Sequence, residues 1–415
     1  MKKAVLSITP APLLALYHFA LAFLAALIYR FPSKRLRVIA VTGTKGKSST
    51  LEYLNAIFET AGSRTALSST IRFKIDDHSE PNVRRQTQPG RFFLQHFLAS
   101  AADKGCDVAL IEMTSEGARQ HRHRFLDLDA LVFLNLAPEH IESHGSLAAY
   151  TNAKFELGKQ LVRSRKRPRI MVANAEDSVS ARFLTLTVES ALPFSLASAT
   201  PFEAGEGGGY FTFEGAKINV RLPGEFSLKN ALAAATVARA IGISVDAIAR
   251  GIASVTRIPG RAEEISEGQS FPVIVDYAHT PDSLAALYAA YPLRRKICVL
   301  GSTGGGRDMW KRPVMGEIAE TYCDHIILTN EDPYDEDPRS IIDMIASGLS
   351  TKTPEIIIDR RSAIKQALSL ARATDVVLIT GKGTDPTIQG PRGTSQLWSD
   401  ADVAREEVKK LLGVR

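Results

Sequence analysis

Cysteine is scarce in this sequence, and so is any long run of charge of one sign. The 415 residues include only three cysteines, Cys106, Cys298 and Cys323, which lie far apart and form no CxxC pair. This spacing argues against a zinc ribbon or a disulfide framework. Because each cysteine lies in or beside an apolar run, we expect three buried structural thiols and a reducing cytosolic environment.

The sequence also lacks a long basic stripe interleaved with aromatic residues. Its formal net charge is +6, but acidic and basic residues alternate through most of the chain. This mild basic bias is compatible with anionic substrates or a membrane surface, and it argues against nucleic acid as a partner. The 45% apolar content and the length of 415 residues predict a globular protein of two or three domains.

One apolar segment, residues 13–28, is too short to span a bilayer as a straight helix. Sixteen helical residues cover about 24 Å, whereas the hydrocarbon core is about 30 Å thick. Three interpretations stay open: a membrane-anchoring or interfacial helix, a helix packed on the protein's own surface, and a signal peptide, although no small-residue cleavage site is evident. The heavier basic flank follows the segment, on the side that the positive-inside rule keeps in the cytosol. The flanking basic residues are Lys2, Lys3, Arg30, Lys34, Arg35 and Arg37.

Strand-like apolar runs alternate with helical patterns through most of the chain. This order predicts an α/β protein with mostly parallel sheets and right-handed crossovers. We expect an apolar N-terminal helix within 1–33, a P-loop-containing central ATP-binding domain at 34–256, and a smaller Rossmann-like C-terminal domain at 257–415, with a hinge in the Pro- and Gly-containing stretch 257–261. The expected strands lie at 38–41, 108–113, 130–136, 169–173, 272–277, 296–300, 325–329, 355–358 and 375–380, with a hairpin at 207–224 and helices at 227–241, 313–322 and 339–349.

The most informative segment is the stretch 38–49, VIAVTGTKGKSS, which reads as strand, glycine-rich turn and helix. Such a turn lets backbone N–H groups surround phosphate oxygens at the positive end of a helix. Lys47 is expected to neutralise phosphate charge, and the Ser48 hydroxyl to ligate Mg²⁺. The predicted nucleotide contacts of this loop are Gly43, Thr44, Gly46, Lys47, Ser48 and Ser49.

Several polar clusters follow strand ends, where open α/β sheets place their sites. Each has an ordinary alternative when taken alone. Glu112 could ligate the same Mg²⁺ or be a solvated carboxylate, His140 could bind a metal or cap a helix, and Lys154 alone reads as a solvated charge. The remaining clusters, 276–282, 301–308 and 381–385, read either as site loops or as capped and flexible turns.

Together these clusters resemble the ATP-dependent Mur ligases of peptidoglycan precursor synthesis, and within that family the tripeptide synthetases. The resemblance runs from about residue 38 to the C-terminus, and DYAHTPDSL at 276–284 is its most specific motif. The other matching motifs, in the family's order, are GTKGKSS, EMTSEG, LAPEHIESHG with Tyr150–Lys154, GEFSLKNALAA, Gly260-Arg261 and GKGTD.

The resemblance implies a role for each matching residue. Lys47 holds the phosphates, Ser48 and Glu112 ligate one Mg²⁺, His140 faces a second, and Lys154 is carbamylated by CO₂ to help position that second metal. The implied nucleotide contacts are Asn230, Arg261, Asp276 and His279. The implied substrate contacts are Thr87, Ser115, Gln120 and Arg122 for the muramoyl peptide, with Asp332, Gly381 and Asp385 on the amino-acid side.

The implied reaction uses two small-molecule substrates, a muramoyl-peptide-like acid and an amino acid. Transfer of the γ-phosphoryl group of ATP converts the poorly electrophilic acid into an acyl phosphate, with two Mg²⁺ ions and Lys47 neutralising charge. The amine then attacks the acyl carbon to form the amide. Closure about the 257–261 hinge is expected to exclude water. We expect a cytoplasmic monomer, with membrane contact through residues 13–28 left open.

Two departures from the family pattern are visible. Only 37 residues precede the strand that leads into the glycine-rich loop, which leaves no room in this sequence for a separate uridine-binding domain. We therefore expect an acceptor that lacks UDP, is recognised differently, or is linked to a lipid. The amino-acid-selecting motif reads Glu331-Asp332-Pro333-Tyr334, with Tyr334 in place of an arginine that would grip the distal carboxylate of diaminopimelate. We predict that diaminopimelate is not the preferred amine.

Two alternatives compete with this interpretation. The first is another acid–amino-acid ligase, similar to folylpolyglutamate or cyanophycin synthetases, although the 276–284 motif argues against it. The second is a non-catalytic nucleotide-binding module, although the joint presence of Lys47, Glu112, His140 and Lys154 argues against a decayed site. Phosphate release that requires both an acid and an amine separates a ligase from such a module.

Overall fold

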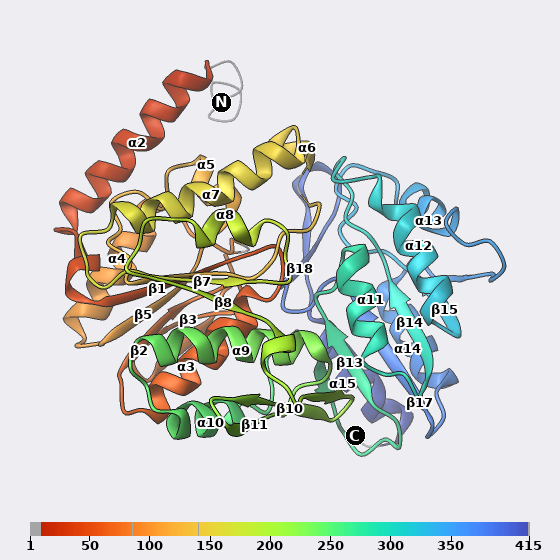
Figure 1. Ribbon diagram of the computed structural model, residues 1–415. Helices are drawn as coiled ribbons and strands as arrows, with labels where there is room; N and C mark the ends of the chain where they lie inside the picture. The colour runs from red at the N-terminus through yellow and green to blue at the C-terminus, as the bar shows by residue number, and fades with distance from the viewer. Residues whose placement is uncertain (1–9, 85, 140, 414–415) are drawn as a thin grey trace.

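The computed structural model describes residues 10–84, 86–139 and 141–413, and its chain forms two α/β bodies side by side (Figure 1). The first body is built on an eight-stranded sheet whose central strands are parallel; only β3 and β4 at one edge are antiparallel. In spatial order its strands are β4 (His78–Pro81), β3 (Arg72–Ile75), β2 (Thr65–Ser68), β5 (Val108–Glu112), β1 (Arg37–Thr42), β6 (Ala130–Phe133), β7 (Ile170–Asn174) and β8 (Ser190–Phe194).

Helices cover both faces of this sheet, and β1 shows why. Ile39 and Val41 join a core with α3, α9 and α10, whereas Val38 and Ala40 join a core with α4 and α7 on the opposite face. A strand that buries both faces needs a continuous apolar run, which is what β1 has. The helices of this body are α3 (Lys47–Thr60), α4 (Arg91–Asp103), α5 (Ser115–Arg119), α6 (Ile141–His144), α7 (Leu147–Arg163), α8 (Ser180–Leu184), α9 (Glu225–Ala240) and α10 (Val245–Ser254), with the 3₁₀ turn η2 (Leu196–Ser198).

A small antiparallel sheet contains the predicted hairpin. β10 (Gly208–Phe213) and β11 (Ala216–Val220) pair across a turn at Glu214 and Gly215, and β9 (Glu203–Gly205) extends the sheet. Both turn residues have positive φ, 46° and 81°, which matches the two-residue turn favoured by twisted hairpins. The prediction of a hairpin within 207–224 is therefore confirmed.

The second body is a six-stranded sheet in which only β12 runs antiparallel to its neighbour. Its strands, in spatial order, are β12 (Glu263–Ile265), β13 (Val273–Asp276), β17 (Asp375–Thr380), β14 (Arg295–Leu300), β15 (His325–Leu328) and β16 (Glu355–Ile356). The predicted α/β class, with mostly parallel sheets and a separate C-terminal sheet, is confirmed. Around the sheet lie α11 (Pro281–Ala289), α12 (Lys311–Tyr322), α13 (Pro338–Ala346), α14 (Arg360–Leu370) and α15 (Asp400–Leu411), with a ribbon of β18 (Thr387–Gln389) and β19 (Ser395–Leu397) and the turn η3 (Pro391–Gly393).

The cysteine prediction is wrong for two of the three residues. Cys298 in β14 and Cys323, directly after α12, form a disulfide with their Cα atoms 6.1 Å apart. They meet because β15 follows α12 at once and pairs with β14, which returns the chain to the sheet beside Cys298. Cys106 is a buried free thiol, as expected, and burial raises its pKa.

The N-terminal apolar segment forms α2 (Ala11–Ile28), which rests on the first body at one end and projects from it at the other (Figure 1). Ala22, Ala25 and Ala26 are buried, and the rings of Phe19 and Phe23 pack on Phe125. Most of its leucines remain exposed. The turn η1 (Pro32–Arg35) then leads into β1. Among the described residues, no helix has the length and apolar character required to cross a membrane.

Candidate active site

The glycine-rich loop connects β1 to the first turn of α3, so the free N–H groups of that helix face the loop. Gly46 has φ of 86°, a left-handed conformation that favours glycine. A Cβ atom at Gly46 would lie 2.2 Å from Oδ1 of Asn230 on α9, so this side chain packs directly against the loop. Ser49 is buried within the first turn of α3.

Two lysines, the partly buried Lys47 and the buried Lys154, converge on the carbonyl oxygens of this loop. Nζ of Lys47 donates to the carbonyls of Gly43 and Thr44 at 3.0 Å each, and Nζ of Lys154 on α7 donates to the same Gly43 carbonyl at 2.8 Å. Burial lowers the pKa of both lysines, and the proximity of Lys47 depresses the pKa of Lys154 further, to well below its usual value. Lys154 is only 2% exposed.

Glu112 lies beside the glycine-rich loop at the end of β5. Oγ of Ser48 donates a short hydrogen bond to its Oε1, and Oγ1 of Thr70 donates to its Oε2 at 2.7 Å. Oγ1 of Thr70 also lies 3.0 Å from Oγ1 of Thr87, whose hydroxyl can donate to it. The two central strands β1 and β5 are parallel neighbours, so their carboxyl ends bring Ser48 and Glu112 to one edge of the sheet.

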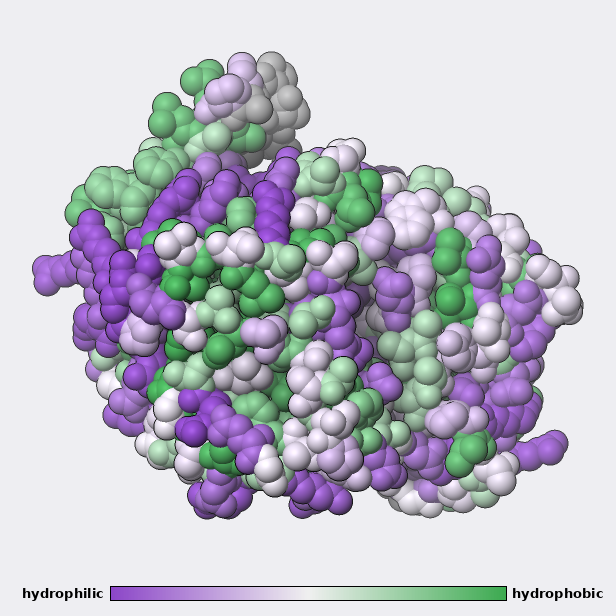
Figure 2. Space-filling model, in the orientation of Figure 1, coloured by the Kyte–Doolittle hydropathy of each residue, from purple (hydrophilic) through white to green (hydrophobic). Residues whose placement is uncertain are grey.

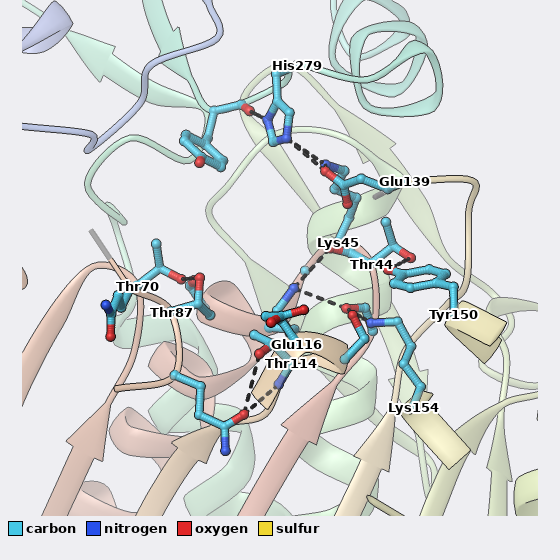
Figure 3. Close-up of a pocket in the computed structure, with 18 of the residues that line it drawn as sticks. Thr44, Lys45, Thr70, Thr87, Thr114, Glu116, Glu139, Tyr150, Lys154 and His279 are labelled. Atoms are coloured by element: carbon cyan, nitrogen blue, oxygen red, sulfur yellow. Dashed lines mark hydrogen bonds and ion pairs between the residues drawn. The ribbon is translucent and has the colours of Figure 1, made fainter. Parts of the chain in front are cut away.

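A second contact joins the loop to the C-terminal body (Figure 3). Nζ of Lys45 donates to Oε1 of Glu139 at 2.9 Å and lies 3.3 Å from Nε2 of His279, which is itself 2.9 Å from the same Glu139 oxygen. Nδ1 of His279 donates to the carbonyl of Tyr277 at 2.6 Å. Burial, followed by the Lys45 charge, lowers the pKa of His279 to about 4.

A cavity of about 440 Å³ lies against the loop and holds many of the predicted residues. Gln120 does not line it; its amide donates to Glu116 at 2.7 Å, and its oxygen accepts from Arg122, which does line the cavity. The Arg261 guanidinium lies over the Tyr277 ring, 4.7 Å from its centre. The predicted residues in the lining are Gly43, Thr44, Gly46, Lys47, Ser48, Thr87, Ser115, Arg122, Lys154, Arg261 and His279.

A second cavity, of about 400 Å³, lies between the two bodies and contains Asp332, Gly381 and Asp385 in its lining. Nζ of the buried Lys382 donates to Asp332 at 2.9 Å and to Asp385 at 3.1 Å. Glu331 also lines this cavity, and burial raises the pKa of its carboxyl group. Within the described residues, its Oε2 atom is buried without a hydrogen-bond partner.

Asp276 has a local structural role at the carboxyl end of β13. Its two carboxylate oxygens accept from the backbone N–H groups of Ala262 and Ala278, both at 2.6 Å. These bonds shape the turn that positions His279, so this aspartate supports the site through the backbone. It does not appear in the lining of either cavity.

The donor set beside the loop suits magnesium in part. Ser48 and Glu112 supply hard oxygen ligands of the kind Mg²⁺ prefers. His140, the expected ligand of a second ion, lies outside the described residues, and those residues contain no group of three or more His, Cys, Asp or Glu that could hold a metal. Because Mg²⁺ is bound mainly through one or two carboxylates together with substrate phosphates, the pair fits such an ion.

Sequence reasoning missed three participants: Lys45, Glu139 and Thr70. Lys45 occupies a loop position for which the motif specifies no residue type. Glu139 was not predicted, although it adjoins His140. Thr70 lies in the connection between β2 and β3 and reaches Glu112 only because β2 pairs with β5 in the sheet. Only the position of Glu139 beside a strand end could have indicated a role.

Comparison with known proteins places this two-body fold in a family of ligases. The Mur ligase middle domain matches residues 41–238, and the Mur ligase glutamate ligase domain matches residues 260–383. A UDP-N-acetylmuramoyl-L-alanyl-D-glutamate–2,6-diaminopimelate ligase of Geobacillus kaustophilus is 36% identical over 94% of this chain and 82% of its own. A UDP-N-acetylmuramyl-tripeptide synthetase of Treponema denticola is 36% identical over 88% of this chain and 75% of its own.

Solved structures agree with this relationship. A UDP-N-acetylmuramoyl-L-alanyl-D-glutamate–2,6-diaminopimelate ligase superposes with a TM-score of 0.61 at 28% identity, covering 91% of this chain and 79% of the other. Folylpolyglutamate synthase of Mycobacterium tuberculosis shares the fold, with a TM-score of 0.72 at 17% identity, covering 98% of this chain and 100% of the other.

The fold and the relatives together define an ATP-dependent amino-acid ligase. The chain belongs to the Mur ligase family, whose members catalyse ATP-dependent addition of amino acids to muramoyl peptides in peptidoglycan synthesis. The expected family and enzyme class are therefore confirmed.

Proposed function

We propose that this chain joins an amino acid to a muramoyl-peptide acceptor through an acyl phosphate, using ATP and Mg²⁺. The convergence of Lys47, Lys154 and the Ser48–Glu112 pair on one glycine-rich loop carries the proposal. Such a loop at a helix N-terminus binds phosphate through backbone N–H groups, and Lys47 adds a positive charge where charge builds up on the transferring phosphoryl group. Mg²⁺, when bound, would neutralise that charge. Ser48 and Glu112 would hold one such ion, and His140 would face a second.

Lys154 is proposed to react with CO₂. The lysine first loses one proton to give the neutral amine. The amine nitrogen then attacks the carbon of CO₂, a C–N bond forms as one C–O π bond opens, and a second proton leaves the nitrogen to solvent, which leaves a carbamate anion. The lowered pKa supports this step because only the neutral amine is nucleophilic, and a lysine that is 2% exposed and near Lys47 is disfavoured as a cation. The carbamate oxygens would then supply the hard ligands that a second Mg²⁺ prefers.

The two cavities divide the substrates in this proposal. Thr87, Ser115 and Arg122 line the larger cavity and would hold the acceptor beside the loop. The smaller cavity would receive the amino acid, with the unpartnered Glu331 oxygen available to its ammonium group. Tyr334 in that lining lacks the positive charge that would grip a distal carboxylate, which supports an amine other than diaminopimelate.

For the whole chain, we propose the boundaries 1–33, 34–256 and 257–415, closure about 257–261, and action as a monomer. Because ATP is the energy source, we place the reaction in the cytoplasm. Asn230, packed on Gly46, and Arg261 and His279 in the lining of the larger cavity are proposed to position the nucleotide.

The test is phosphate release measured with combinations of acids and amines, with mass detection of the product. We expect release only when an acceptor acid and an amino acid are both present, together with an amide product and ADP. Release that ignores both would favour a nucleotide-binding module. Release that depends on a folate or a polyamide acid in place of a muramoyl peptide would favour the folylpolyglutamate-like or cyanophycin-like alternative.

A further inference from the structure

Helix α2 presents apolar side chains to solvent along most of its length. Leu16 is 63% exposed, Leu27 52% and Ile28 56%, and α2 contains no Asp, Glu, Lys or Arg. Figure 2 shows this helix as a hydrophobic projection standing beside a strongly hydrophilic part of the first body. Exposed apolar surface of this extent marks an interaction site for a protein or a membrane, and the exposed basic residues in the segment that follows suit an anionic lipid surface. Those basic residues are Arg30, Lys34, Arg35 and Arg37.

Three arginines lie on the surface where α2 meets the body. Arg91, Arg122 and Arg124 are half-buried, and within the described residues no Asp or Glu forms an ion pair with any of them. The Nε atoms of Arg91 and Arg124 are buried without a hydrogen-bond partner in the same part of the chain. Partly buried cations in proteins are normally paired, so this cluster carries positive charge that an anion would balance.

The cluster is joined to both α2 and the acceptor cavity. Nη2 of Arg91 donates to Nδ1 of His18 on α2 at 2.8 Å and to the carbonyl of Gln120 at 3.0 Å. Nη2 of Arg122 donates to the Gln120 side chain at 2.7 Å, and Arg122 lines the larger cavity. Arg124 lies 6.0 Å from the centre of the Phe19 ring on α2. One continuous set of contacts therefore runs from the apolar helix to the proposed acceptor site.

We propose that α2 and the three arginines form a docking site for a phosphate-bearing lipid headgroup, so that the acceptor is a muramoyl peptide carried on a lipid phosphate in a membrane. This rests on the proposed ligase function. The apolar helix would enter the interface, the arginines would bind the phosphate, and the sugar and peptide would extend past Arg122 into the cavity. Arginine suits this role because its planar donors bind phosphate oxygens in pairs.

The surface is tested with the full chain and phosphatidylcholine vesicles that contain a polyprenyl-phosphate-linked muramoyl peptide. Leu16→Glu/Leu24→Glu/Leu27→Glu is compared with Leu293→Glu/Leu397→Glu/Leu411→Glu, which alters three exposed leucines elsewhere with the same added charge. We expect the α2 variant to lose vesicle binding at least tenfold while it still ligates a water-soluble muramoyl dipeptide, and the control to bind like the wild type. Equal vesicle binding by both variants would overturn the proposal. So would a wild type that does not bind vesicles but forms a dimer that the α2 variant disrupts and the control does not.

The arginines are tested by the choice of acceptor. Arg91→Gln/Arg124→Gln is expected to raise KM for the vesicle-embedded acceptor about tenfold more than KM for the phosphate-free dipeptide, whereas Arg250→Gln, on an exposed arginine paired with Asp246, changes neither. Vesicles with phosphatidylglycerol but no acceptor separate general anionic lipid from the acceptor's own phosphate; binding that needs only phosphatidylglycerol would overturn the lipid-linked acceptor. If no acceptor supports phosphate release by the wild type, the ligase proposal itself fails.

Discussion

The chemical role that can be assigned to Lys154 depends on its neighbours in space. On an isolated helix a lysine is an ordinary solvated cation. Here its Nζ is buried against the Gly43 carbonyl, near Lys47, and its pKa is strongly lowered by burial and by that second cation. A lysine held in this way can react with CO₂, and the resulting anion would offset the positive charge of Lys47.

Lys154→Ala is therefore expected to lower kcat about a hundredfold, the order of loss found when one charge-stabilising group is removed. Short carboxylic acids should restore part of the activity, because their carboxylate can occupy the vacated space. Lys159→Ala, at an exposed lysine on the same helix, is the control. Full activity of the Lys154→Ala enzyme in a steady-state assay would contradict the carbamate.

Tyr334 offers a second test at the scale of one side chain. It lines the smaller cavity with φ of 54° and has the Arg307 guanidinium 5.0 Å from its ring centre. We expect the wild type to prefer an amino acid other than diaminopimelate, and Tyr334→Arg to raise kcat/KM for diaminopimelate about tenfold by supplying a charge-assisted hydrogen bond to its distal carboxylate. Tyr334→Phe should leave kcat/KM for diaminopimelate unchanged. A wild-type enzyme that already works best with diaminopimelate would refute this prediction.

At the scale of elements, the side chain of Glu320 on α12 binds the loop that precedes β16. Its carboxylate accepts from the backbone N–H groups of Ser350, Thr351 and Lys352, with oxygen–nitrogen distances of 2.6 to 3.0 Å. These donors lower the pKa of Glu320 to about 2, below its usual value of 4.5. The contact joins segments about 30 residues apart and so fixes the position of the loop before β16 relative to α12.

The direction of the pKa shift of Glu320 determines how this contact depends on pH. Because the folded-state pKa is lower than the unfolded value, the contact stabilises the fold above about pH 4.5 and is lost as pH falls toward about 2. Glu320→Gln should therefore lower the melting temperature at pH 7, and its difference from the wild type should shrink in acid. Glu317→Gln, an exposed glutamate on the same helix, is the control. A melting-temperature difference that stays constant from pH 7 to pH 3 would contradict the prediction.

At the scale of the whole molecule, the two bodies meet around the cleft through specific polar contacts. Lys45 and Glu139 of the first body contact His279 of the second, and the backbone N–H of Ile141 donates to Asp308 at 3.2 Å. Further from the cleft, Arg294 donates twice to Glu206, at 2.7 and 2.9 Å. The described arrangement thus brings the glycine-rich loop and the second sheet into direct contact, which a reaction between phosphate, acid and amine requires.

Gly260, in the proposed hinge, has φ of 61° and packs on the 383–384 backbone of the second body. A Cβ atom there would lie 2.5 Å from the backbone nitrogen of Thr384. Gly260→Ala is expected to cost about 1–3 kcal/mol more than Gly268→Ala in the free energy of unfolding measured with urea, and to lower kcat. Gly268 has a similar positive φ of 104°, but the nearest atom to its added Cβ is 3.9 Å away, so it carries only the backbone strain. Equal effects of the two substitutions would show that the close approach does not matter.

Much of the fold was predictable because the strands of both sheets are short apolar runs separated by helices and turn residues. The same pattern located the loop at 43–48 and the polar residues at strand ends, and the hairpin turn at Glu214-Gly215. The disulfide between Cys298 and Cys323 and the role of Thr70 were not predictable, since both depend on which strands become neighbours. The antiparallel pair of β3 and β4 was not predicted either, because β4 is exposed and lacks an apolar run.

The sequence by itself determined the α/β class, the strand–loop–helix segment and the family, because apolar periodicity and glycine spacing act within a few residues. The tertiary structure alone brings Lys47 and Lys154 to one carbonyl, Glu139 to His279, and α2 to three arginines that form no ion pair within the described residues. Such contacts depend on strand order and on the docking of one body against another. They join residues 73 to 140 positions apart, for which local pattern carries no information.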